Sequence, residues 1–341
     1  MRTSASRPAD VGKFRRLGAI LIFGAVVGLG AQVFAWGPTG HFYSTVAVME
    51  RRAKVRSGPV AKSEVLTALC SYLPDLSREL DAITLGVNAF TSGYGGTAVT
   101  WGLFDRCWGS SVRRMVVVQH YLHGLTGTDS SQVTAAARAV VTTLSASLRD
   151  SPSDPVRACA LGFSFHLLGD SYAHRKVRHE DQMYGTGLGH FRDGSAPDAP
   201  LSSPARLAVW ESYVIDLTKL TQVEAGPTKV QDLFDIGERL LPSVTGGGWD
   251  DFRMRVDLQR SITSDRAIAW FPFVPAVEDM ERRALSQRLV ASCDDILRYF
   301  APGVAPAGLS CKEVWKAFLD AAVPAFSEVP PQCDGGDEVF E

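Results

Sequence analysis

The chain has almost no excess charge, and it lacks several motifs by which the chemistry of a protein is usually recognised. Its 341 residues include 35 Lys and Arg against 37 Asp and Glu, a net charge of −2, so composition gives no basic field to attract nucleic acid. The absence of any Cys-x-x-Cys pair argues against a thiolate zinc finger. Internal repeats, low-complexity tracts, a phosphate-cradling glycine motif and a nucleophile elbow are also missing. Covalent catalysis is therefore not expected, and the histidines and carboxylates are the candidate functional residues.

The apolar run between Leu17 and Gly30 is too short and too rich in glycine for a comfortable membrane span, which needs about 20 residues. Lys13, Arg15 and Arg16 stand shortly before it, and Val33-Phe34-Ala35 then offers the small or branched residues that signal peptidase reads. The sequence predicts a secretory signal peptide over residues 1–35, cleaved after Ala35, and a protein that is secreted or periplasmic. A retained signal anchor is the alternative.

An even number of cysteines in an exported chain allows disulfides. Their connectivity cannot be read from the spacing, although the last three could join parts of the C-terminal region. The six are Cys70, Cys107, Cys159, Cys293, Cys311 and Cys333.

The most informative stretch is a polar stripe at the end of an apolar helix. His166, Asp170 and His174 recur every four residues, so in a helix their side chains lie along one face. Residues 156–165 before them are mostly apolar, which predicts a buried helix. Two imidazoles and a carboxylate on one helix face are typical of metal ligands. The alternative is a histidine-rich face satisfied by water and salt bridges.

The expected mature N-terminus provides a further donor. An α-amine has an ordinary pKa of about 7.7–8.0, so the amine of Trp36 can lose its proton cheaply and bind a metal, and His41 follows across a Gly-Pro-Thr-Gly turn. Trp-Gly-x-x-Gly-His after a signal peptide, followed later by His-x-x-Gly-Asp, resembles the zinc-dependent phospholipase C and S1/P1 nuclease superfamily. The resemblance covers residues 36 to about 200. It implies three Zn²⁺ ions in an all-helical domain, one of them chelated by the N-terminal Trp.

The resemblance also implies a ligand for each ion, position by position. Asp75 matches an Asp ligand of the family and is a candidate general base, with an N-cap for the following residues as its alternative role. His120 matches a His-Tyr pair, which leaves His123 beside the site or as the alternative ligand. His190 and Asp198 match the donors of the remaining zinc, with Asp193 as the alternative carboxylate. The implied sets are Asp75, His120, His166 and Asp170 for one zinc; Trp36, His41 and Asp170 for the second; and His174, His190 and Asp198 for the third.

The sequence departs from the nuclease pattern after Asp170, because His174 follows at a spacing of four and no Gln-Pro is present. This is closer to a bacterial branch of zinc phospholipase C-like proteins. The expected reaction is hydrolysis of a glycerophospholipid to diacylglycerol and a phosphorylated head group. Aromatic residues in 101–108 and 269–274 suit a site that meets a membrane or micelle surface. A zinc nuclease or phosphatase is the alternative, a non-catalytic metal-stabilised protein is the third possibility, and no protein partner is inferred.

Few segments alternate with period two, which predicts an all-α fold, and the resemblance specifies a helical bundle of the phospholipase C/P1 nuclease type. Every histidine lies between residues 41 and 190, so the chemistry is expected within 36–200. The helical domain is expected over 36–329, followed by a loose acidic tail over 330–341. Helices are predicted at 42–54, 63–72, 130–148, 207–220, 230–241, 254–268, 281–299 and 312–322.

Overall fold

The structure is a computed structural model of the full chain. It describes residues 40–42, 44–46, 48–49, 52, 57–58, 60–82, 84–86, 110–186, 197, 203–221, 292–300, 304–327 and 339. All of these belong to one compact unit, Val33–Glu341. The predicted signal peptide, the predicted helices at 230–241 and 254–268, most of the predicted tail, and the aromatic segments at 101–108 and 269–274 lie outside the described residues.

The described part of the chain is mostly helical, as an all-α fold requires. Residues 40–42, 44–46 and 48–49 are helical, and the only strands among the described residues form one short antiparallel pair, β1 (Arg175–Lys176) with β2 (His179–Met183). The remaining elements, in chain order, are α3 (Lys62–Tyr72), the 3₁₀ turn η1 (Leu73–Asp75), α6 (Ser110–Tyr121), α7 (Ser130–Asp150), α8 (Pro155–Ala173), α9 (Pro204–Leu220), α13 (Cys293–Phe300) and α14 (Cys311–Ala325).

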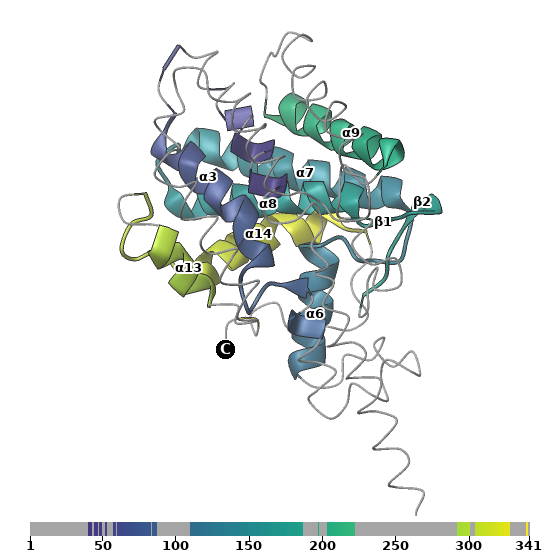
Figure 1. The fold of residues 1–341 in the computed structure, drawn as a ribbon. Coiled ribbons are helices and arrows are strands. Elements are labelled where there is room, and N and C mark those ends of the chain that lie inside the picture. The colour runs from purple at the N-terminus through teal and green to yellow at the C-terminus, as the bar shows by residue number, and fades with distance from the viewer. Residues whose placement is uncertain are drawn as a thin grey trace, which may run out of the picture. The chain divides into compact units, whose positions relative to one another are not determined.

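Helix α8 is the central element, and it contacts α3, α7, α9 and α14 (Figure 1). Its start follows from sequence: Asp154 accepts hydrogen bonds from two free N–H groups of the first turn, and Pro155 occupies the first helical position, where no N–H is needed. All residues from Ala158 to Ala173 are buried. A helix that is buried on every side has to be surrounded by other elements, and this explains its central position.

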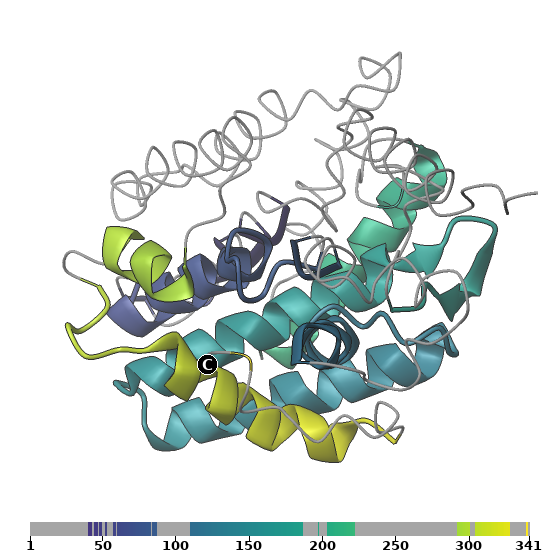
Figure 2. The ribbon, with the colours of Figure 1, turned by 90° about the horizontal axis from the view of Figure 1, so that it is seen from below.

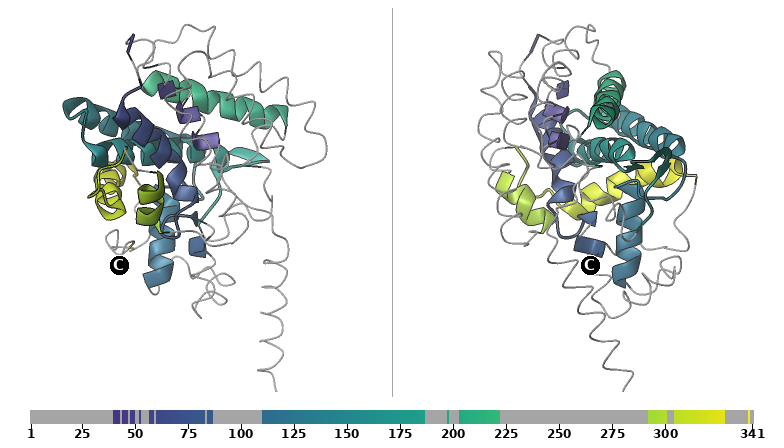
Figure 3. Two further views of the ribbon diagram at one scale, coloured as in Figure 1. Left: turned by 60° about the vertical axis from the view of Figure 1, so that its left-hand side comes forward. Right: turned by 45° about the vertical axis from the view of Figure 1, so that its right-hand side comes forward.

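The neighbours of α8 run in different directions. Helices α7 and α14 are seen from the side together with α8 in Figure 2, whereas α6 is seen nearly end-on, so α6 is steeply inclined to them. Helix α9 lies on the side of α8 away from α14 (Figure 3). None of the helices within the described residues is long and apolar enough to cross a bilayer.

Helices α3 and α8 approach each other unusually closely. Gly162 allows this, because a Cβ built there would lie 2.4 Å from the carbonyl oxygen of Thr67. The hydroxyl of Thr67 donates to the carbonyl of Ala158 at 2.9 Å, and a disulfide joins Cys70 to Cys159. Because this disulfide closes a loop with a sequence separation of 89 residues, chain entropy alone gives it a stabilisation of about 4–5 kcal/mol.

A second disulfide, Cys293–Cys311, joins α13 to the first residue of α14. The side chain of Ser310 accepts from the backbone N–H of Glu313 and so caps α14. The predicted helix at 281–299 is described only from Cys293 onward. The two pairings resolve, for four of the six cysteines, the connectivity that the spacing left open.

The chain leaves α8 through the β1–β2 hairpin, which the sequence did not predict. The backbone N–H of Tyr184 donates to the carbonyl of His174 at 3.0 Å, and that of Met183 donates to the carbonyl of Thr128 at 2.8 Å. The hairpin is thus tied both to the end of α8 and to the loop before α7. These long-range bonds leave no periodic signal in so short a strand pair.

Candidate metal centre

Helix α8 presents His166 and Asp170 on one face, as the i,i+4 spacing predicts. Both side chains are fully buried. A buried carboxylate is costly unless it is paired, so the neighbours of Asp170 determine what this face of the helix can bind.

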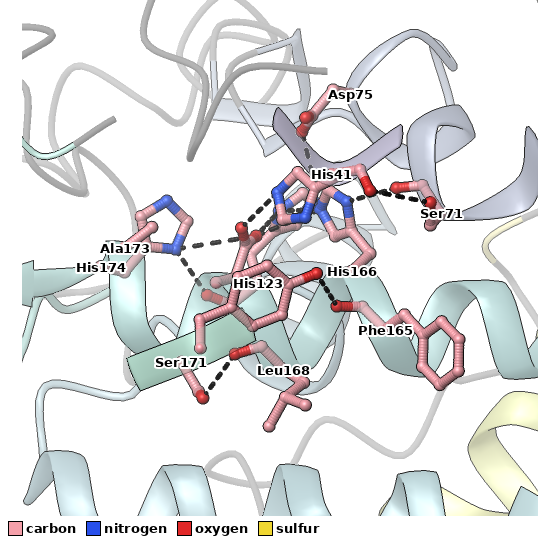
Figure 4. A network of polar contacts seen from close by, with 12 residues as sticks. His41, Ser71, Asp75, His123, Phe165, His166, Leu168, Ser171, Ala173 and His174 are labelled. Carbon is pink, nitrogen blue, oxygen red and sulfur yellow. Dashed lines mark hydrogen bonds and ion pairs between the residues drawn. The ribbon is translucent and has the colours of Figure 1, made fainter. Parts of the chain in front are cut away.

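Three further donors come from other parts of the chain. His41 lies in the helical segment at residues 40–42, Asp75 ends η1, and His123 follows the end of α6. The rings of His41 and His166 lie next to each other above α8, with centroids 4.1 Å apart, and Asp75 approaches from the far side (Figure 4). Two groups of three have their donor atoms within 4.8 Å of one another: His41, His166 and Asp170; and Asp75, His123 and His166. These buried histidine and aspartate side chains are close enough together to hold a metal ion.

The separations between donor atoms match those around a small metal ion. Nε2 of His166 lies 3.1 Å from Oδ2 of Asp170, 3.6 Å from Oδ1 of Asp75 and 3.3 Å from Nδ1 of His123. In a tetrahedral zinc site with bonds of about 2.0–2.1 Å, neighbouring donor atoms are about 3.3 Å apart. Each of these separations from Nε2 of His166 is therefore compatible with two ligands of one small ion.

Hydrogen bonding fixes which nitrogen of His166 faces the cluster. Its Nδ1–H donates to the carbonyl of Ser71 at 3.0 Å, so the lone pair is on Nε2. That lone pair faces two carboxylates and a second imidazole nitrogen. Electron pairs that face one another in a dry interior repel, and a cation between them removes the repulsion.

His41 and Asp170 give independent support. Nε2 of His41 lies 3.0 Å from Oδ1 of Asp170, yet neither atom takes part in a hydrogen bond among the described residues. The same holds for Nδ1 of His41. Buried polar atoms are almost always hydrogen-bonded, so unsatisfied atoms at this distance fit two ligands of one ion. Imidazole nitrogen and carboxylate oxygen form a donor set that several first-row transition-metal ions use, Zn²⁺ among them.

The electrostatics of the metal-free cluster follow from burial and from the shared carboxylate. Burial lowers the pKa of His166 to about 4, against the opposing pull of Asp170, so this ring is neutral near pH 7. For His123, burial also disfavours the charge, but the hydrogen bonds to Asp170 and Leu80 and the negative charge of Asp170 outweigh it and raise the pKa. Burial acts against ionisation of Asp170, but His166, His174 and His123 outweigh it and hold its pKa well below the usual range.

His174 lies at the edge of this cluster. It follows α8 directly, and its Nδ1–H donates to the carbonyl of His123 at 2.6 Å. The same nitrogen is 3.8 Å from Oδ2 of Asp170. The structure thus brings His174 near the carboxylate without making it a member of either group of three.

The structure places His120 in a different environment. Its ring packs against Tyr121 and Phe326, with centroid distances of 4.8 and 5.2 Å, and it lines a small cavity of about 30 Å³ together with Thr126 and Gln132. His123, three residues later, occupies the place in the cluster that the resemblance had given to His120. The alternative already open in the sequence, His123 as ligand, is the one that the geometry favours.

Three of the nine sequence-predicted site residues, Trp36, His190 and Asp198, lie outside the described residues, as does the alternative Asp193. Among the described ones, His41, Asp75, His166 and Asp170 come together. Comparison of the chain with models of protein families, with curated proteins and with solved structures finds no match.

Proposed function

We propose that the protein is an exported, zinc-dependent phosphoric diester hydrolase. Its reaction is that of a phospholipase C, which releases diacylglycerol and a phosphorylated head group from glycerophospholipids. Its helices form a bundle of the phospholipase C/P1 nuclease type. The observation that carries the proposal is the buried meeting of His41, Asp75, His123, His166 and Asp170, which have the donor chemistry and the spacing of a metal centre.

The proposal takes His123 rather than His120 as a ligand, because His123 alone of the two contacts Asp170. His123 Nε2–H donates to the carbonyl of Leu80 at 2.8 Å, which leaves Nδ1 as the coordinating atom. Trp36, His174, His190 and Asp198 complete three zinc positions as the sequence predicts. Export is supported by two disulfides in the described part of the chain.

Different residues of the chain would have different roles in this reaction. Zinc bound at this centre would polarise a phosphoryl oxygen and activate water for attack on the phosphodiester. Asp170 directs its two oxygens to different partners, Oδ1 to His41 and Oδ2 to His123 and His166, and so can connect two ion positions. Asp75, which ends η1 beside Nε2 of His166, is the candidate general base that the resemblance implies.

The choice of a phospholipid rests on the sequence. The near-neutral net charge gives no basic approach for nucleic acid, and the aromatic segments at 101–108 and 269–274 suit a lipid surface. The substrate is therefore expected at a membrane or micelle surface, with little cleavage of nucleic acid.

The test compares two substrates with one preparation. Purified mature protein should contain close to three zinc ions per chain and should release phosphocholine and diacylglycerol from phosphatidylcholine vesicles, with little cleavage of single-stranded DNA or RNA. His166→Ala should lower the activity by orders of magnitude, whereas His179→Ala, at an exposed position on β2, should not.

Each other outcome has a distinct meaning. Active protein without zinc would overturn the proposal as a whole. Cleavage of nucleic acid with inert vesicles would overturn the lipid substrate and leave the metal centre in place. Bound zinc with neither activity would point to a metal-stabilised protein without catalysis.

A further inference from the structure

The C-terminal end of α3 and the following turn η1 each contribute a contact to the cluster. The carbonyl of Ser71 accepts from Nδ1–H of His166 at 3.0 Å, and its hydroxyl lies 3.4 Å from the carbonyl of His41 (Figure 4). One turn later, Oδ1 of Asp75 lies 3.6 Å from Nε2 of His166. A shift of this end of α3 along α8 would therefore change the surroundings of both nitrogens of His166.

The residue directly before Ser71 is Cys70, which forms the disulfide with Cys159. Cys159 lies on α8 seven residues before His166, about 10 Å along the helix. Between them, Gly162 brings the two backbones so close that an added Cβ would lie 2.6 Å from Cβ of Cys70. The contact between α3 and α8 is thus held by the disulfide at one point and by the hydrogen bond between Ser71 and His166 at another.

We infer that the Cys70–Cys159 disulfide is a positioning element of the metal centre. It fixes the register of α3 against α8, so that the carbonyl of Ser71 keeps Nε2 of His166 directed toward the other donors. Partners that orient a ligating histidine in this way are worth about 10–100-fold in metal affinity. The inference rests on the proposed function only in that the cluster binds a metal ion.

The second disulfide provides a matched control. Cys293–Cys311 links α13 to α14; α13 packs against η1, but neither cysteine adjoins in sequence a residue that contacts His166. Replacement of both partners by Ala avoids buried hydroxyl groups. Cys70→Ala/Cys159→Ala should weaken zinc binding at least tenfold in a chelator competition, and Cys293→Ala/Cys311→Ala should change it less than twofold.

A measurement on the wild-type protein keeps the inference testable if the first variant does not fold. Linkage is reciprocal, so a disulfide that favours zinc binding must in turn be favoured by bound zinc. In a glutathione redox buffer we expect zinc to raise the equilibrium constant for forming Cys70–Cys159 at least tenfold more than that for forming Cys293–Cys311. Differential alkylation followed by peptide mass analysis assigns the thiols to each pair.

A spectroscopic readout separates positioning from general loss of stability. With Co²⁺ in place of zinc, the visible absorption of Cys70→Ala/Cys159→Ala should change in shape, while that of the control variant should not. Zinc affinity and Co²⁺ spectrum that are unchanged in a folded Cys70→Ala/Cys159→Ala variant would overturn the inference and leave the metal centre standing. An equal effect of zinc on the two equilibrium constants would also overturn it. A wild-type protein that binds no zinc would instead overturn the proposed function.

Discussion

Replacing His123 by Ala removes three contacts at the centre of the cluster. The ring of His123 lies 2.7 Å from Oδ2 of Asp170 through Nδ1 and 2.8 Å from the carbonyl of Leu80 through Nε2. Its Nδ1 is also 3.3 Å from Nε2 of His166. An alanine offers none of these atoms, so Asp170 loses a partner and a bound metal ion would lose a ligand.

The size of the effect can be worked out from the number of donors. Structural zinc sites with four ligands bind with apparent free energies of about 10–16 kcal/mol, or about 2.5–4 kcal/mol per ligand. At 1.4 kcal/mol for each tenfold change in a binding constant, loss of one ligand should weaken zinc binding by a factor of about one hundred to one thousand. If His123 only oriented Asp170 without touching the metal, the loss should stay within about 10–100-fold.

The assay is zinc affinity by competition with a chromophoric chelator, with circular dichroism to verify folding. His120→Ala is the matched control, because His120 is also a buried histidine of the same region but lines the cavity beside Phe326. It should lower stability by about 1–3 kcal/mol and change zinc affinity less than threefold. Loss of zinc in His120→Ala together with full affinity in His123→Ala would refute the assignment of the ligand.

Two more predictions follow from the packing. Gly162→Ala should lower the free energy of unfolding by about 3 kcal/mol in a urea titration, because its Cβ would meet the carbonyl of Thr67 at 2.4 Å. Gly308→Ala is the control and should be nearly neutral, because nothing lies within 4 Å of a Cβ at that position. Equal effects of the two substitutions would contradict the close contact between α3 and α8. Removal of metal by a chelator should lower the thermal midpoint, because donors from residues 41, 75, 123, 166 and 170 are held together by the ion, and restoring zinc should reverse the loss. An unchanged midpoint in a protein shown to have lost its metal would contradict that role.

Much of the helical framework could be predicted from sequence because its signals are local. The Asp154-Pro155 start of α8 is a cap followed by proline, and the predicted helix at 130–148 has its counterpart in α7, which begins after the cap Asp129. The β1–β2 hairpin was not predicted, because its bonds join it to Thr128 and His174 rather than following a pattern within the strands. Tertiary hydrogen bonds of this kind cannot be read from hydrophobic periodicity.

In the candidate site, too, some positions follow from local sequence signals and others depend on tertiary structure. His166 and Asp170 share a helix, so their spacing alone places them together. The choice between His120 and His123 depends instead on where α6 ends. The helix stops at Tyr121, and the chain then turns through Gly124, whose φ of +60° is a left-handed conformation. Because His123 lies beyond the helix, the helical spacing from His120 gives no information about the direction of its side chain.

Among the described residues, the protons around Asp170 are fewer than the electron pairs that face its carboxylate. Four imidazoles lie within 4.0 Å of its carboxylate, but the Nδ1 proton of His166 goes to Ser71 and that of His174 goes to His123. His123 can donate to both Asp170 and Leu80 only as an imidazolium, and His41 makes no ring hydrogen bond among the described residues. Buried polar networks that serve stability are normally satisfied throughout, since each unmet group costs more than its bond would return. Electron pairs that converge on one buried carboxylate in this way are the arrangement in which a cation would be bound.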